Sequence, residues 1–172
     1  MIMKRTTLLT ALLLVLAAPT PAQTWFDITE DYVINPNFTG NIDGWDDGFT
    51  AAAQNHGYQS ASYSNKGVFI RQFAEAWRPD NDWWTGGILG DGAISQSLTE
   101  LPAGEFRLEV DAIAVDQGNR NNPVSGVLLF ISDSDNEAAT SLSTGNGLPE
   151  HFTVSTTTSR HELTIGARTE NT

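Results

Sequence analysis

Residues 90–114 read GDGAISQSLTELPAGEFRLEVDAIA. In the first half, Ile94, Gln96 and Leu98 alternate with serines, and from Phe106 onward apolar residues alternate with charged ones. A period of two is typical of β-strands with one buried face. The Leu-Pro-Ala-Gly sequence at 101–104 favours a turn, so the stretch predicts a β-hairpin. The residues predicted to face the core are Ile94, Gln96, Leu98, Phe106, Leu108, Val110, Ala112 and Ala114.

Short segments of the same kind recur along the chain, and residues that favour turns separate them at intervals of about a dozen positions. Around the Asn65-Lys66-Gly67 turn, 58–63 and 68–76 form a second predicted hairpin, and the weakly helical segment 71–77 is assigned to its second strand. The acidic, Ser/Thr-rich segment 133–147 is predicted to be a loop. This pattern predicts an all-β fold, an antiparallel β-sandwich. The remaining predicted strands are 25–34, 124–132, 151–156 and 163–169.

The first 22 residues have the layout of a secretory signal peptide. Lys4 and Arg5 precede an apolar run from 8 to 18, and Thr20-Pro21-Ala22 offers a small residue for cleavage. The run is too short for a membrane span. We therefore expect a signal peptide at 1–22, one domain at 23–172, and secretion to the periplasm or the extracellular space.

The mature chain is strongly acidic and has no cysteine. Removing residues 1–22 takes away two of nine basic residues and none of the 21 acidic ones, which leaves a formal charge of 7 − 21 = −14. Such a surface repels nucleic acid and anionic lipid. The absence of cysteine excludes thiol catalysis, disulfides and cysteine-ligated zinc. The predicted partners therefore include neither nucleic acid nor an inserted membrane.

An aromatic and polar segment after Trp77 is the best candidate for a ligand site. It places two adjacent tryptophans among charged and amide side chains, a combination that is difficult to bury completely. Flat aromatic faces pack on the C–H faces of sugar rings, and planar polar groups bind their hydroxyls. One of the tryptophans could instead close the end of the sandwich, and Trp77 and Trp45 are assigned structural roles. The predicted ligand-binding residues are Trp83, Trp84, Arg78, Asp80, Asn81, Asp82 and Tyr58.

Metal-binding and catalytic motifs are weak. Two carboxylate groups have the oxygens that hard cations prefer, but neither has the spacing of a twelve-residue calcium loop, and a solvated acidic loop is the alternative. The histidines fit no zinc spacing, no Gly-x-Ser-x-Gly elbow is present, and Glu75 with Glu150 would form a glycosidase pair only if folding brought them together. We predict no catalytic residue in this chain. The two carboxylate groups are Asp43, Asp46 and Asp47, and Asp133, Asp135 and Glu137.

Several segments, in this order, resemble a galactose-binding-like jelly-roll domain of secreted Bacteroidetes proteins. They are Asp31–Phe38, Gly44-Trp45, Leu89–Gln96, Leu101–Leu108, Pro149–Val154 and Leu163–Gly166. The resemblance implies a jelly roll that acts as a carbohydrate-binding module, and related modules often hold a structural calcium. The chain departs from the family at Thr39, where a Glu is usual. The family also ends in a strand that carries Trp and Asp-Asn, and in this chain that strand would lie beyond Thr172.

Together these observations predict a secreted, non-catalytic carbohydrate-binding module that targets a linked protein or catalytic domain to polysaccharide. Two alternatives stay open. In the first alternative, the chain is a structural or protein-interaction β-sandwich. In the second, it is the N-terminal accessory domain of a glycoside hydrolase. Because the segment 163–169 is still in strand register close to residue 172, we expect the sequence to be part of a longer protein.

Overall fold

The computed structural model describes residues 23–49, 55–60, 72–77, 89–116, 122–144 and 148–170. Strands dominate this part of the chain, as the period-two pattern predicts. Its single helix has four residues, and no described helix is long and apolar enough to cross a membrane. The elements are α1 (Thr29–Tyr32), β1 (Asp46–Asp47), β2 (Asn55–Gln59), β3 (Phe73–Trp77), β4 (Gly92–Thr99), β5 (Gly104–Ala112), β6 (Val127–Ser132), β7 (Glu137–Ser141), β8 (Glu150–Thr158) and β9 (Glu162–Thr169).

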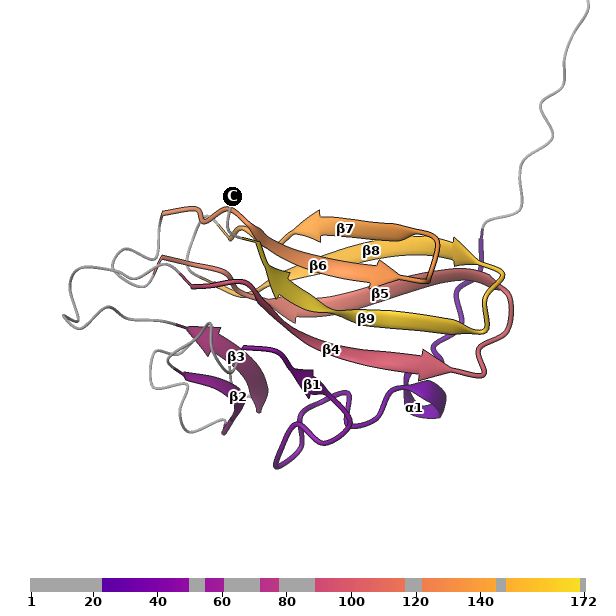
Figure 1. The fold of residues 1–172 in the computed structure, drawn as a ribbon, viewed down its shortest axis with the longest axis horizontal. Helices are drawn as coiled ribbons and strands as arrows, with labels where there is room; N and C mark the ends of the chain where they lie inside the picture. Colours follow the sequence, from indigo (N-terminus) through magenta and orange to yellow (C-terminus); the bar gives the residue numbers. More distant parts are fainter. Residues whose placement is uncertain are drawn as a thin grey trace, which may run out of the picture.

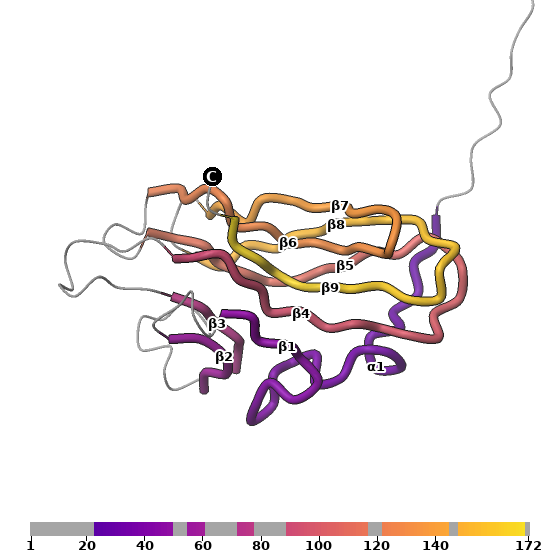
Figure 2. The backbone as a smooth tube through the Cα atoms, in the orientation of Figure 1, coloured from indigo at the N-terminus to yellow at the C-terminus, as the bar shows by residue number. Residues whose placement is uncertain are grey.

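The strands form a two-layer antiparallel β-sandwich, as predicted. One layer is a five-stranded sheet in the order β1-β4-β9-β6-β7, and β5 with β8 forms the sheet that lies against it (Figure 1). The β2–β3 pair lies beside β1, at the end of the sandwich opposite the connections β4–β5 and β8–β9 (Figures 1 and 2). We call the end that contains those two connections the arch end.

The strand pairs are nested along the sequence. The outermost pair is β4 with β9, the next is β5 with β8, and the innermost is β6 with β7. The prediction of a hairpin over 90–114 is therefore wrong, because β4 and β5 lie in different sheets. Leu101 begins the link between them and is 1% exposed. Its N–H donates to the carbonyl of His161 in the neighbouring connection, so the two links bridge the layers side by side.

The core lies between the two sheets and contains the residues that the alternation places there. Ile94, Gln96 and Leu98 are buried, and the apolar residues of β5 pack on the central cluster. The predicted strand at 124–132 is confirmed by β6, which lies inside the larger sheet between β9 and β7. The buried cluster consists of Leu98, Leu101, Ala114, Leu129, Ile131, Leu142, Val154, Leu163 and Ile165.

Two segments differ from the prediction. The segment 25–34 forms the short helix α1, because Ile28 and Tyr32, one helical turn apart, both pack on the core and Asp27 accepts the N–H of Thr29. The predicted loop 133–147 contains β7, which pairs along β6 despite its polar sequence. The second predicted hairpin is β2 paired with β3, and residues 61–71 between them lie outside the described residues.

Candidate functional site

The predicted ligand segment lies outside the described residues, which include Trp77 and resume at Leu89. The structure describes the strands that precede this segment, which are β1, β2 and β3. We call Asp47, Asn55, His56, Tyr58 and Glu75 the β2–β3 surface. The predicted ligand-binding residues that lie outside the described residues are Arg78, Asp80, Asn81, Asp82, Trp83 and Trp84.

An aspartate and a histidine form the first polar pair of this surface. His56 Nδ1 lies 2.6 Å from Asp47 Oδ2, and the second carboxylate oxygen of Asp47 accepts the backbone N–H of Phe49. The two side chains are 27% and 16% exposed. The imidazole is therefore held in a fixed orientation through one ring nitrogen, and the other ring nitrogen has no hydrogen-bond partner among the described residues.

An amide and a carboxylate form the second pair. Asn55 Nδ2 donates to Glu75 Oε1 over 2.8 Å, across the β2–β3 ladder. Asn55 stands opposite Trp77 in the same ladder, and His56 stands opposite Ala76. Both polar pairs thus lie next to the last residue before the tryptophan segment.

Trp77 and Tyr58 are both half-buried. The indole Nε1 of Trp77 is buried and has no hydrogen-bond partner in the described part of the chain, a costly arrangement for an N–H donor. Tyr58 stands opposite Ala74 on the β2–β3 ladder. The structure therefore brings Tyr58, the one described member of the predicted ligand set, to the strand that carries His56.

Trp45 has the structural role predicted for it. Its indole Nε1 donates to the carbonyl of Ile34 over 3.0 Å, and its ring packs on the core cluster. Gly44, with φ of +86°, allows this approach, since an added Cβ would lie 2.6 Å from Ile34 Cγ2. Gln96, buried in β4, accepts the N–H of Ile34 and donates to its carbonyl. Segment 34–45 is therefore bound to the sandwich by side chains instead of a strand ladder.

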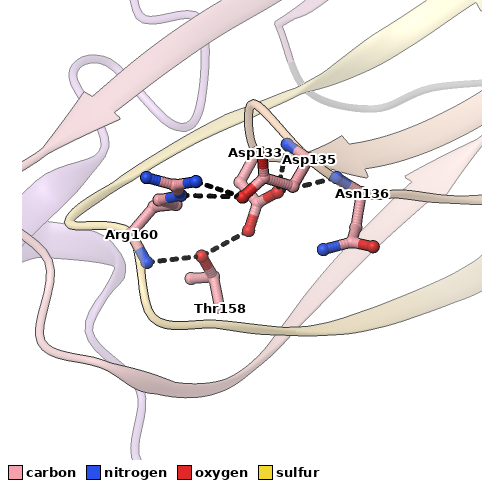
Figure 3. A network of polar contacts seen from close by, with 5 residues as sticks. All are labelled: Asp133, Asp135, Asn136, Thr158 and Arg160. Atoms are coloured by element: carbon pink, nitrogen blue, oxygen red, sulfur yellow. Dashed lines mark hydrogen bonds and ion pairs between the residues drawn. The ribbon is translucent and has the colours of Figure 1, made fainter.

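Five of the six carboxylates proposed as metal ligands have other partners. Asp43 accepts from Asn41 Nδ2 and Asp47 binds His56. At the arch end, Asp135 pairs with Arg160 (Figure 3). On the outer face of the larger sheet, Glu137 of β7 pairs with Arg168 of β9. Among the described residues, no group of three or more metal-ligating side chains comes together.

Asp133 organises the turn between β6 and β7. Its Oδ1 accepts the N–H groups of Asp135 and Asn136, and its Oδ2 accepts the hydroxyl of Thr158 in β8 (Figure 3). These hydrogen bonds, that from Thr158 foremost, hold the pKa of Asp133 below its ordinary value. The Arg160 N–H donates in turn to the Thr158 hydroxyl, so the β6–β7 turn is tied to the β8–β9 connection.

Two open hollows at the arch end are the alternative location for a ligand. One, of about 300 Å³, is lined by Thr99 and residues 159–162, and the other, of about 250 Å³, lies among hydroxyl and acidic side chains of the larger sheet.

Of the other histidines, His161 Nδ1 lies 2.7 Å from the carbonyl of Leu101, and His151 Nδ1 lies 3.0 Å from Asp111 Oδ1. Glu75 and Glu150 belong to different sheets.

The His56–Asp47 and Asn55–Glu75 pairs were not predicted from the sequence. Their members are separated by 9 and 20 positions and match no motif. Of these four residues only Glu75 lies close to the aromatic segment in the sequence, so the sequence carries no direct signal for the two pairs. Comparison of the chain with protein-family models, curated proteins and solved structures finds no match.

Proposed function

We propose that the chain is a secreted, non-catalytic carbohydrate-binding β-sandwich of the jelly-roll type. The nested pairing of β4 with β9, β5 with β8 and β6 with β7 supports the jelly roll, because that fold is an antiparallel ribbon wrapped into two sheets. The resemblance to galactose-binding-like domains and the signal-peptide pattern at 1–22 support the remainder.

The observation that carries the proposal is a pair of oriented polar contacts beside the strand that precedes the tryptophan segment in the sequence. In the sequence, the segment with Trp83 and Trp84 follows β3 directly. Beside the last residue of β3, the structure has two polar pairs, His56–Asp47 and Asn55–Glu75, already oriented by hydrogen bonds. Sugars need an aromatic face for stacking and fixed planar donors and acceptors for their hydroxyls.

The binding that we propose is weak at each site. Exposed polar contacts replace well-bonded water, so the net gain in free energy is small. Such a module functions by keeping a linked protein or domain close to a polysaccharide, where a high effective concentration compensates for low affinity. Its acidic surface favours uncharged or cationic glycans over polyanions.

A glycan-array screen of the mature chain tests the proposal, with calcium and then with chelator. We expect binding to at least one class of neutral glycan, and loss of that binding in the W83A/W84A double variant. Trp25→Ala is the matched control, because this tryptophan packs over Arg107 of β5, away from β2 and β3. A chain that is folded by circular dichroism and binds no glycan contradicts the proposal and favours a protein-interaction domain.

A further inference from the structure

The segment that follows the predicted signal peptide is held on the outer face of β5. Gln23, the first residue after that peptide, is exposed, and its Nε2 donates to Glu105 Oε2 over 2.7 Å. Two residues later, Arg107 Cζ lies 4.5 Å from the centre of the Trp25 ring. Both contacts bind the segment to β5, whereas chain ends without such contacts are commonly disordered.

A glutamine at the start of a chain can react with its own α-amine. The predicted signal peptide ends at Thr20-Pro21-Ala22, so cleavage after Ala22 frees the α-amine of Gln23. Only Cα, Cβ and Cγ then separate the amine nitrogen from the amide carbon Cδ of the same residue. Because the two reacting groups belong to one residue, the amine acts on the amide at a high effective concentration.

We propose that Gln23 of the secreted chain closes on its own α-amine to form pyroglutamate, and that Glu105 assists the reaction. The lone pair of the amine nitrogen forms a bond with Cδ, and the Cδ–Nε2 bond breaks. Nε2 leaves as ammonia with the proton that the amine loses, so nothing is oxidised or reduced and no co-reactant is needed. The new amino end is an uncharged lactam. This inference rests on the secretion that we propose and does not depend on carbohydrate binding.

Glu105 contacts the atom that must leave. An amide nitrogen departs readily only after it has gained a proton, which gives it a positive charge in the intermediate. A carboxylate within hydrogen-bond distance of Nε2 stabilises that charge and can pass the proton from the attacking nitrogen to the departing one. Because both side chains are exposed, we expect an acceleration of about tenfold, less than general acid–base catalysis gives in an enclosed active site.

Intact mass spectrometry of the mature chain tests the proposal, because ring closure lowers the mass by one ammonia. The chain is released from a fusion by a protease that leaves Gln23 as its first residue, and the loss of ammonia is followed with time. We expect this loss to be about tenfold faster than in the free peptide Gln-Thr-Trp-Phe-Asp, which has the same first residues and lacks Glu105.

Two variants separate the role of Glu105 from that of its strand. Glu105→Gln should lose ammonia at the rate of the free peptide. Asp111→Asn is the matched control and should keep the rate of the unmodified chain, because Asp111 is an exposed carboxylate on the same face of β5 and pairs with His151 instead. A chain no faster than the peptide overturns the proposal, and so does a Glu105→Gln variant as fast as the unmodified chain.

Export of the full chain by its own signal peptide gives the second measurement. We expect a mature mass that begins at Gln23 and is lower by one ammonia. If the chain is cut after Ala22 and Gln23 is still intact after the time that the released chain needs for ring closure, the proposal is overturned and secretion stands. A chain that keeps its leader, or is cut at another bond, overturns the proposal together with the predicted leader at 1–22.

Discussion

The two ends of the sandwich are built from different kinds of contact. At the arch end, a backbone bond beside a buried leucine and a side-chain bond connect the layers. The N–H of Leu101 donates to the carbonyl of His161, and the Asp133 carboxylate accepts the hydroxyl of Thr158 in β8. On the β2–β3 surface, the connecting groups are half-exposed polar pairs, next to a buried indole N–H that has no hydrogen-bond partner among the described residues. Saturated contacts favour stability, whereas oriented groups with spare hydrogen-bonding capacity favour binding. The arch end is therefore the expected centre of stability, and the β2–β3 surface is the place where we propose that a ligand binds.

Leu101→Ala should have the largest effect on stability. Leu101 is 1% exposed at the point where the chain crosses between the sheets, so its truncation leaves a cavity. We expect a loss of about 2–5 kcal/mol in the free energy of unfolding, measured by chemical denaturation. Leu148→Ala is the matched control, because that side chain is 55% exposed. Equal losses in the two variants would show that the arch end is not a centre of stability.

Gln96→Ala should destabilise the chain by a smaller amount. The Gln96 amide is buried and forms two hydrogen bonds with the backbone of Ile34. Its removal leaves the Ile34 N–H without its acceptor, at a cost of about 1–3 kcal/mol in the free energy of unfolding, whereas the Ile34 carbonyl keeps the hydrogen bond from Trp45 Nε1. Ser97→Ala, on the exposed side of β4, should change stability little. A thermal denaturation midpoint for Gln96→Ala equal to that of Ser97→Ala would refute this role.

His56→Ala tests whether the β2–β3 surface binds the glycan. If His56 donates to a bound glycan, its loss should weaken binding by about tenfold, since one hydrogen bond contributes about 1.4 kcal/mol. His151→Ala removes the other cross-strand His–Asp pair, which lies on the outer face of β5 and β8 and is 57% and 65% exposed. Isothermal titration should give unchanged affinity for that variant. Weaker binding by His151→Ala than by His56→Ala would show that the glycan does not bind at the β2–β3 surface.

The smallest expected effect is on the pH dependence of stability. Asp133 has a pKa held below its ordinary value by the hydrogen bond from Thr158, so its carboxylate stabilises the fold above the unfolded pKa near 3.8. That contribution is lost as the pH falls through the lower, folded pKa.

In Thr158→Val, the folded pKa of Asp133 should move back toward its ordinary value, and the fold should lose part of its stability near neutral pH. NMR titration of the Asp133 carboxyl measures the shift. A variant whose Asp133 titrates as in the unmodified chain would show that the hydrogen bond does not govern this group.

The strand pattern was predictable because a period of two is a local property. The alternation at 94–98 and 106–112 located β4, β5 and their buried faces correctly. The alternation could not distinguish a hairpin from a connection between two sheets. Two strands show the same alternation of apolar and polar residues whether they pair in one sheet or face each other across the core. Strand β7 was missed since Glu137, Ala138 and Ala139 have low β-propensity, and the strand is held by its pairing with β6.

The candidate site was less predictable. Tyr58 is the one member of the predicted ligand set that the described residues include, and it lies on the same strand as His56. The His56–Asp47 pair depends on how β1 and β2 meet in space, and no sequence spacing encodes that distance.

Amide chemical-shift mapping with a glycan identified by the array tests the central comparison most directly. We predict that shifts change at residues 46–47, 55–58 and 75–77, on β1, β2 and β3, and at 89–92 leading into β4. Changes concentrated instead at residue 99 and residues 158–162, around the hollows of the arch end, would contradict the account and move the binding site to the opposite end of the sandwich.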